Sequence, residues 1–421
     1  MNINYENYIV HITVQQKDID LKHPLNSFSN SKSSGTGFYI DKGFVLTCYH
    51  VIQNSLEIMV STKNKSNNTI KIKANVKYIF PDDDLAVIEL ESHDIIYSVF
   101  DYYIITTAEI NKDVNTIGYP LNSTSLKINK GVISGFQDSN IQTDSTLNPG
   151  NSGGPLILNN KVIGINQSKM SGDATNTGYA IPIFRFLILF KLKKDKLKLI
   201  NYKPKFLFKY QRNQQKFNNF EYGVRVSKIN NLSILKKSGI FVNDLILEIN
   251  KNKIDSLGNI KFDFFPGKIM LNDLGLWFTE NDELLFTIYS NKEKQIKNIK
   301  IIAKYIQNNL INYHTESDIQ YNFEKKGLVF SIFTNYHIEL LKEMEISLIL
   351  KVKLLSRSLD DKFTVYLSDL IYDKLKFTDY PINEIITHIN EIEISSYSTL
   401  IEVMKTDIKN FRTIDNDFFL I

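Results

Sequence analysis

The stretch TDSTLNPGNSGG at residues 143–154 of the 421-residue chain places one serine among three glycines, shortly after a proline. Such a segment favours neither helix nor strand, so its backbone can bend tightly around Ser152. A serine becomes an effective nucleophile when a base removes its proton and backbone N–H groups stabilise the oxyanion that forms. The turn Gly150-Asn151-Ser152 is therefore the predicted oxyanion hole, with the N–H groups of Gly150 and Ser152 as donors.

The base for such a serine is expected to be a histidine, and His50 is the one whose position fits. It ends the run FVLTCYH, so its imidazole lies at the end of a predicted strand, where a cleft could open. The orienting acid is predicted to be Asp84, directly before the apolar run LAVIEL, whereas Asp82 and Asp83 are expected to be solvated. The order His50, Asp84, Ser152 indicates a catalytic triad. The other histidines are interpreted as surface or packing residues: His11, His23, His93, His314, His337 and His388.

The elements that would position these residues are short runs rich in β-branched and aromatic residues, over 8–135 and 155–181. Turn clusters such as NKSNN and PDDD separate the runs, which predicts a β-barrel or a β-sandwich. The run at 183–194 is a predicted helix that closes this domain. Two α+β units follow, and the phrases DLILEINKNKI and INEIITHINEIEI form a weak internal repeat between them. The expected domains are 1–195, 196–308 and 309–421, in a mainly β chain with α+β modules.

The composition excludes a globally disordered chain, because 43% of the residues are hydrophobic. The net charge of +4 is too weak to indicate a nucleic-acid partner, and eight lysines at 191–209 are interpreted as a helix end that runs into a solvated linker. Cys48 is the single cysteine, which rules out an intrachain disulfide and fits a reducing compartment. No signal peptide or membrane-inserting run is recognised, so we expect a soluble protein of the cytoplasm or nucleus, or one packaged in a virus particle.

Seven segments of the chain together resemble the protease domain of the HtrA/Deg family, which are serine proteases of the chymotrypsin fold. They are GTGFYIDKGFVLTCYHVI, DDDLAVIEL, TIGYPL, KGVISG, TDSTLNPGNSGGPLI, KVIGINQS and GYAIPI. The resemblance covers roughly residues 8–190 and implies a double β-barrel with the active site between the barrels. A weaker similarity, at 233–254 and 366–405, is to the two PDZ domains of plant-type Deg proteases. The expected fold is therefore a chymotrypsin-like double β-barrel followed by two PDZ-like domains.

The resemblance also implies residues for substrate binding. Thr146 and Leu147 should line the pocket for the side chain before the cut, and Leu147 suggests an apolar preference. The far wall, which would pair with an extended substrate, should be Ile165, Asn166, Gln167 and Ser168.

Two further features of the sequence concern how the enzyme is controlled. Asn151 stands where digestive trypsins carry an aspartate that pairs with a freed N-terminal amine, so no zymogen cleavage is expected. The connection GFQDSN at 135–140 is short for the family, which implies a site that is constitutively ordered or held by another contact.

The PDZ-like units imply partners as well as substrates. Gly327, Leu328, Val329 and Phe330 resemble a loop that binds the C-terminal carboxylate of a peptide, and the alternative is that these units only mediate assembly. The family usually assembles as trimers, a contact that Tyr5 and Tyr8 could serve.

The sequence predicts an ATP-independent serine endopeptidase that cuts unfolded or flexible proteins, with no metal and no organic cofactor. The alternative is a catalytically latent scaffold or a chaperone-type binding protein that keeps the protease fold. An intact triad and both glycine-turn donors favour the enzyme, because a lost function seldom leaves every part in place.

Overall fold

The computed structural model of the chain describes most of its 421 residues. The described ranges are 3–18, 29–92, 94–137, 139–167, 177–193, 206–213, 217–230, 233–263, 267–304, 322–334, 348–359, 362–371 and 384–421, with residues 197, 199, 201, 203–204, 265, 337, 374–375 and 380–382. The chain forms two compact units, which are described separately below. The first consists of Met1–Lys17, Asn30–Ile229 and Ser233–Tyr305, and the second consists mainly of Ile306–Ile421.

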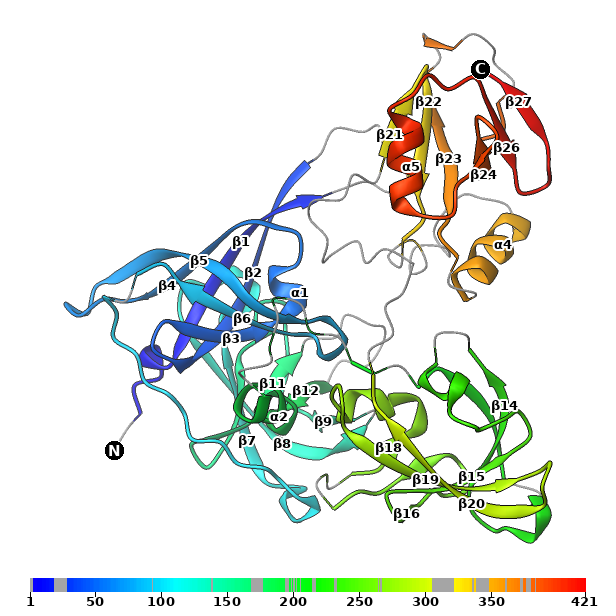
Figure 1. Ribbon diagram of the computed structural model, residues 1–421. Coiled ribbons are helices and arrows are strands. Elements are labelled where there is room, and N and C mark those ends of the chain that lie inside the picture. The colour runs from blue at the N-terminus through cyan, green and yellow to red at the C-terminus, as the bar shows by residue number, and fades with distance from the viewer. Residues whose placement is uncertain are drawn as a thin grey trace. The chain divides into compact units, whose positions relative to one another are not determined.

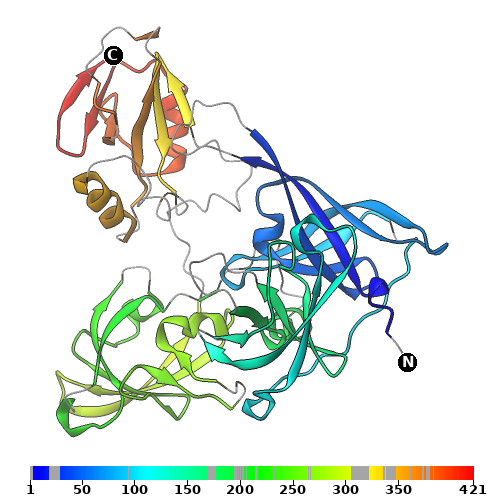
Figure 2. The same cartoon turned by 180° about the vertical axis from the view of Figure 1, so that it is seen from behind.

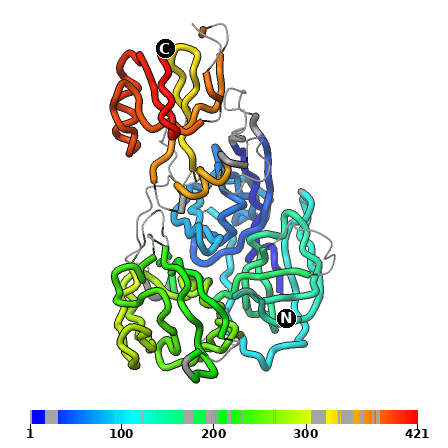
Figure 3. Tube along the Cα trace, turned by 90° about the vertical axis from the view of Figure 1, so that its right-hand side faces the viewer, coloured from blue at the N-terminus to red at the C-terminus, as the bar shows by residue number. Residues whose placement is uncertain are grey.

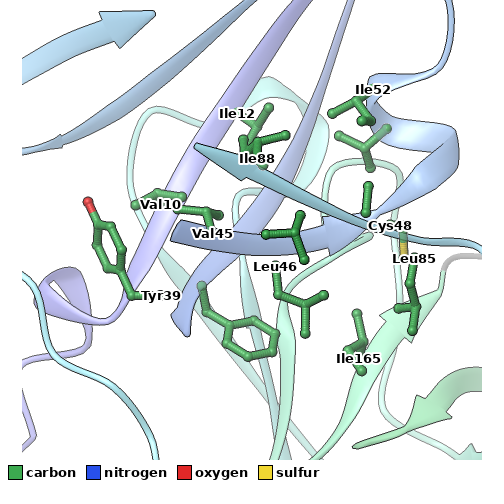
Figure 4. Packing of buried hydrophobic residues seen from close by; sticks show 14 of the residues in the cluster. Val10, Ile12, Tyr39, Val45, Leu46, Cys48, Ile52, Leu85, Ile88 and Ile165 are labelled. Carbon is green, nitrogen blue, oxygen red and sulfur yellow. The ribbon is translucent and has the colours of Figure 1, made fainter. Parts of the chain in front are cut away.

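The N-terminal part of the first unit is a closed six-stranded barrel in the order β1-β2-β3-β6-β5-β4 (Figure 1). Its strands are β1 (Ile9–Asp18), β2 (Ser29–Asp41), β3 (Phe44–Cys48), β4 (Ser55–Lys63), β5 (Thr69–Phe80) and β6 (Leu85–Leu90). The short helical turns are η1 (Tyr5–Asn7), α1 (Tyr49–Ile52) and η2 (Pro81–Asp83). β-Branched and aromatic side chains fill the barrel, and Figure 4 shows Val10, Val45 and Leu46 among them.

A second closed barrel follows, in the order β10-β11-β12-β9-β8-β7. Its strands are β7 (Asp113–Gly118), β8 (Lys127–Gln137), β9 (Asn140–Thr143), β10 (Pro155–Leu158), β11 (Lys161–Gln167) and β12 (Gly178–Pro182), with turns η3 (Thr107–Glu109) and η4 (Pro120–Asn122). The predicted closing helix is α2 (Ile183–Lys193). The two barrels confirm the predicted chymotrypsin-like double β-barrel, and Figure 3 traces them in blue and in cyan to green.

The rest of the first unit is a mixed module with the sheet order β13-β14-β15-β19-β20, in which β16 pairs with β15. Its elements are β13 (Phe208–Arg212), η6 (Phe217–Asn219), β14 (Val224–Ile229), η7 (Ile234–Lys237), β15 (Leu245–Ile249), β16 (Asn252–Lys253), β17 (Asn259–Ile260), β18 (Ile269–Met270), η8 (Leu271–Trp277), β19 (Glu283–Ser290) and β20 (Gln295–Ile302). The helix-like run SILKKSG at 233–239 forms only the short turn η7.

This module contacts the β8–β9 hairpin of the second barrel, which includes the short connection at 135–140. The indole Nε1 of Trp277 donates to Ser139 Oγ at 2.9 Å, and the rings of Phe136 and Phe265 lie 5.5 Å apart between centroids. The neighbouring module therefore contacts this hairpin, while the expected control of the site stays a prediction.

The second unit is a sheet in the order β21-β22-β23-β24-β26-β27, with β25 paired to β24. Its elements are β21 (Asn322–Lys325), β22 (Leu328–Ile332), α4 (Leu348–Leu359), β23 (Val365–Leu370), β24 (Ile385–Ile389), β25 (Ile392–Glu393), α5 (Tyr397–Met404), β26 (Asn410–Thr413) and β27 (Phe418–Leu420). Helix α5 crosses one face of the sheet, which Figure 2 shows from the opposite side.

Both α+β modules are consistent with PDZ-like domains, while the domain boundaries stay a prediction. Among the helices in the described part of the chain, none combines the length and the apolar character needed to cross a bilayer.

Candidate active site

His50 and Asp84 come from neighbouring turns at one end of the first barrel. Strand β3 ends at Cys48, and the single turn of α1 follows it, while η2 delivers Asp84 at the start of β6. Asp84 adopts a left-handed backbone conformation with φ of 52°, which aspartate tolerates better than most residues. Its carbonyl oxygen accepts the N–H of Tyr49 at 3.0 Å, which ties the two turns together.

The carboxylate of Asp84 holds His50 at two points. Its Oδ1 accepts the backbone N–H of His50 at 2.9 Å, and its Oδ2 lies 2.8 Å from the ring Nδ1. With the proton on Nδ1, the other ring nitrogen, Nε2, is left to accept a proton. Burial lowers the pKa of His50, but the hydrogen bond and the charge of Asp84 together outweigh burial and raise it above its ordinary value. The ring stays accessible, with 39% of the side chain exposed.

The loop before β10 carries Ser152, and its backbone geometry explains why two of its positions are glycine. Gly150 and Gly153 have φ values of +99° and +83°, in the left-handed region that favours glycine. A Cβ on Gly150 would lie 2.3 Å from Tyr119 O, and one on Gly153 would lie 2.2 Å from both Thr36 O and Thr47 Oγ1. No side chain fits at either position, because the backbone of this loop packs directly against its neighbours.

The Ser152 loop of the second barrel is fastened to the strand β2 of the first. The N–H of Thr36 donates to Ser152 O at 2.9 Å, and the hydroxyl of Thr36 donates to Gly150 O at 2.7 Å. A Cβ on Gly153 would lie 2.9 Å from the backbone nitrogen of Cys48, two residues before His50. The structure therefore brings the Ser152 segment against the segment that carries His50 and Asp84.

The structure contradicts one member of the predicted oxyanion turn, Asn151. The N–H of Asn151 donates to Asn148 O at 2.9 Å, so this amide closes the turn and is not available to an oxyanion. The N–H of Gly150 has no acceptor within the part of the chain that the structure describes. Gly150 and Ser152 remain the proposed donors, and Asn151 is removed from the set.

The comparisons with known proteins concern the part of the chain that carries this site. The family described as "Trypsin-like peptidase domain" matches residues 35–165. The chain is 31% identical over 186 residues to the putative protease Do-like 13 of Arabidopsis thaliana, and 29% identical over 252 residues to a probable periplasmic serine endoprotease DegP-like of Chlamydia trachomatis. This part of the chain is similar to a trypsin-like peptidase domain and to serine proteases of the HtrA/Deg family.

These matches have limited extent. They cover 42% and 54% of this chain, and 37% and 48% of the two relatives, so the chain spans less than half of their length. A solved variant of the HtrA-type protease AlgW with a decapeptide superposes with a TM-score of 0.56, over 72% of this chain and 95% of that chain. At 18% identity, this last likeness shows the fold alone.

Gln167, which is predicted to bind substrate, also contacts the acid of the predicted triad. Its side-chain Nε2 donates to Asp84 Oδ2 at 2.7 Å. Asp84 Oδ2 thus accepts from both the His50 ring and Gln167, which fixes the orientation of the carboxylate. A glutamine at the end of β11 carries no signal in the sequence that would reveal this contact.

The predicted far wall of the substrate pocket is wrong for two residues. The side chains of Ile165 and Asn166 are fully buried. The N–H of Asn166 donates to Gly154 O at 2.8 Å, and its carbonyl oxygen accepts the N–H of Gly153 at 2.9 Å, so Asn166 cannot pair with a substrate backbone. Ser168 lies outside the described residues.

The near wall of the substrate pocket, predicted at Thr146 and Leu147, stays a prediction. Thr146 is exposed, and its carbonyl oxygen accepts Asn129 Nδ2 at 3.0 Å. Leu147 leans against β12, where a Cβ on Gly178 would lie 3.0 Å from Leu147 Cδ1. The absence of a side chain at Gly178 leaves room for Leu147 at that position.

Cys48 is fully buried beneath the triad, near Leu85 and Ile165 (Figure 4). Its thiol donates to Asn166 O at 3.4 Å, and burial, followed by the charge of Asp84, raises its pKa well above the ordinary value. The sulfur and the ligand atoms of His50 and Asp84 lie within 4.8 Å of one another. A metal there would need the thiolate and would take Asp84 from His50, so the cluster fits packing and proton transfer better than metal binding.

The peptide-binding loop predicted at Gly327–Phe330 is wrong. Strand β22 is paired on both edges, with β21 and with β23, so it cannot accept an added peptide strand. The N–H of Gly327 already donates to Glu324 Oε1 at 3.0 Å. A pocket of about 240 Å³ lies instead between the edge strand β21 and helix α5, lined by Phe323, Glu324, Lys325, Ile401, Met404 and Lys405.

Asp83 is also placed differently from the prediction. It was expected to be solvated, but its side chain is buried and paired with Arg185 of α2. Lys203, expected in a solvated linker, is buried beside it. The lone arginine in the apolar run FRFLILF was the available signal, because such a residue in a buried helix needs an anionic partner.

Proposed function

We propose that this chain is an ATP-independent serine endopeptidase that cuts unfolded or flexible protein segments through an acyl-enzyme. The observation that carries the proposal is the Asp84 carboxylate, which binds both the backbone N–H and the ring Nδ1 of His50. This double contact sets the ring orientation and the tautomer that a general base needs. The names of the relatives, protease and serine endoprotease, support the same reaction class.

The proposed reaction follows from the positions of these groups. The Oγ of Ser152 attacks the scissile carbonyl carbon while Nε2 of His50 takes the hydroxyl proton. The oxyanion lies against the N–H groups of Gly150 and Ser152, and the Asp84 charge stabilises the imidazolium. His50 then gives its proton to the leaving amine, which departs and leaves an ester on Ser152. Water, deprotonated by His50, cleaves this ester and restores the serine.

The substrate is proposed to be an extended segment with a medium-sized apolar side chain before the cut, held by Leu147. The partners proposed for the second unit are peptide C-termini, which would add to the exposed edge of β21 beside α5. The pocket there combines apolar Phe323 and Ile401 with Lys325 and Lys405, whose charges suit a terminal carboxylate.

A homo-oligomer built on trimers and a reducing compartment remain proposals. The rings of Tyr5 and Tyr8 pack on Phe100 of their own chain, with centroids 6.2 and 4.4 Å away, and both side chains are only half-buried. Light scattering of the purified protein, with Tyr5→Ala and Tyr8→Ala as variants, tests this assembly.

The decisive experiment is labelling of the purified protein with a fluorophosphonate probe, together with Ser152→Ala and His50→Ala. Labelling of the unmodified chain and of neither variant, with cleavage of an unfolded protein in the absence of ATP, supports the endopeptidase. Labelling that persists in Ser152→Ala would overturn the assignment of the nucleophile. If the unmodified chain is unlabelled with and without C-terminal peptides, the latent scaffold replaces the enzyme.

A further inference from the structure

A buried cluster of three charged side chains lies directly beside the triad. Asp83 is fully enclosed, and the side chains of Arg185 and Lys203 are only 4% and 7% exposed. Nε and Nη2 of Arg185 donate to Asp83 Oδ1 at 3.0 and 2.8 Å. Nζ of Lys203 lies 3.3 Å from Asp83 Oδ2, as an ion pair rather than a well-aligned hydrogen bond.

The three charges come from segments that are distant in sequence. Asp83 belongs to η2, Arg185 to the closing helix α2, and Lys203 to the segment that leads from α2 to the first PDZ-like module. The backbone N–H of Lys203 also donates to Asp82 Oδ2 at 2.8 Å, so two consecutive aspartates of η2 hold this segment.

Buried charges of this kind are costly to desolvate, and such a cluster contributes little net stability. The cluster can instead fix the position of η2, because the buried Asp83 carboxylate can contact both Arg185 and Lys203 in few positions. The residue that η2 delivers is Asp84, which is held in a left-handed conformation at the very next position. A small displacement of η2 would therefore move the carboxylate that holds His50.

We propose that Asp83, Arg185 and Lys203 form a positioning cluster that fixes Asp84 against His50, and that Lys203 couples this position to the first PDZ-like module. The coupling contact is the hydrogen bond from Nζ of Lys203 to Leu276 O in η8, at 3.3 Å. Nη1 of Arg185 extends the cluster to Asn140 Oδ1, at 3.4 Å, at the start of β9. The inference rests on the proposed function, since it concerns the same triad.

The test uses the pKa of His50, measured by NMR on the full chain with ¹³C-labelled histidine and with His50→Gln for assignment. All variants carry Ser152→Ala, so the readout does not depend on activity. Lys203→Met keeps the Asp83–Arg185 pair and so leaves the carboxylate compensated. The matched control is Lys130→Met, which removes an exposed lysine that is paired with Asp113 at 2.8 Å and is 68% exposed.

The sign of the change in the pKa of His50 distinguishes a loss of Asp84 positioning from the effect of removing a charge. Removing a positive charge near His50 would by itself raise the pKa of the imidazole. Loss of a well-placed Asp84 lowers it, and we expect a fall of about 0.5 unit or more, a fraction of the 1–3 units that an adjacent opposite charge supplies. Each variant is checked by thermal unfolding to be folded at the measurement temperature.

The outcomes separate this inference from the proposed function. A rise or no change in Lys203→Met, relative to Lys130→Met, overturns the positioning cluster even if the unmodified enzyme is labelled by fluorophosphonate. A fall in Lys203→Met supports the cluster even if labelling fails, in which case the proposed reaction is wrong and the cluster stands. If the Ser152 enzyme is labelled, a supporting result also requires Lys203→Met to lower its kcat more than it changes KM.

Discussion

The second unit should lose stability between neutral and mildly acidic pH because of one buried histidine. The Nδ1 of His337 accepts the N–H of Thr334 at 3.0 Å, and its Nε2 lies 3.2 Å from the hydroxyl of Tyr366. Phe333 stacks on the ring with centroids 5.3 Å apart. Burial lowers the pKa of His337 to about 3, because a charged ring there would be desolvated. The same proton would also remove the acceptor that Thr334 uses.

The sign and the size of this loss of stability follow from the linkage between proton binding and folding. In the unfolded chain the imidazole has its ordinary pKa of 6.5, so the unfolded state gains protons first as the pH falls. The contribution of a neutral His337 is fully present above that pKa and is lost as the pH drops from there toward the folded value. At about pH 5 the loss is about 2 kcal/mol, from about 1.36 kcal/mol per unit. This figure barely depends on the folded pKa, as long as that value lies below about 4.

Hydrogen–deuterium exchange of the full chain measures this loss locally. Peptides that cover β22 and β23 should exchange about 30-fold faster at about pH 5 than at neutral pH, after correction for the intrinsic rate. In His337→Asn, whose Oδ1 can still accept from Thr334, most of that pH dependence should disappear. Peptides from β10 and β11 serve as the internal control. Equal pH dependence of β22 in both proteins would refute the buried neutral histidine.

Three other predictions concern the site and the groove. Asp84→Asn should reduce kcat by about 10³- to 10⁴-fold. The acid limb of the pH profile of kcat/KM should move to lower pH, since His50 loses the group that raises its pKa. An acid limb at the same pH in this variant would contradict the role of Asp84. Gly153→Ala should abolish fluorophosphonate labelling and lower the melting temperature more than Gly239→Ala, whose φ of +90° is similar but whose nearest contact to a Cβ is 3.8 Å away. Ile401→Glu should weaken C-terminal peptide binding in a titration without changing labelling of Ser152, whereas the exposed control Glu402→Gln should bind peptide normally.

The parts of this chain that the sequence predicted well are those decided by local backbone chemistry. The glycines around Ser152 indicate a bend that only glycine tolerates, and the structure shows a left-handed Gly150 and Gly153 at that bend. The run FVLTCYH indicates a strand that ends at His50, and β3 ends two residues earlier, at Cys48, with His50 in the turn that follows. The Asn159-Asn160 turn is likewise found between β10 and β11, with both residues at positive φ.

The parts that the sequence predicted badly depend on which distant segments meet. Asp83 reads as a turn residue beside Asp82, and its burial is decided by Arg185, 102 positions later. The run Leu328–Ile332 has the composition of any strand, and its place between β21 and β23 follows from pairing with both. Gln167 reaches Asp84 only because the two barrels pack together. Composition and periodicity describe one segment at a time, and these contacts join two.

The candidate site is therefore a property of the contact between the barrels rather than of either barrel. His50 and Asp84 belong to the first barrel, and Ser152 to the loop before β10 of the second. One residue of β2, Thr36, uses its N–H and its hydroxyl to hold the carbonyl oxygens of Ser152 and Gly150, and so fixes the backbone of that loop against the first barrel. In the other direction, Gln167 of the second barrel donates a hydrogen bond to Asp84 of the first. Because each barrel supplies a fixed hydrogen-bonding group to the catalytic loop of the other, a shift between them would loosen the oxyanion donors and the Asp84–His50 pair together.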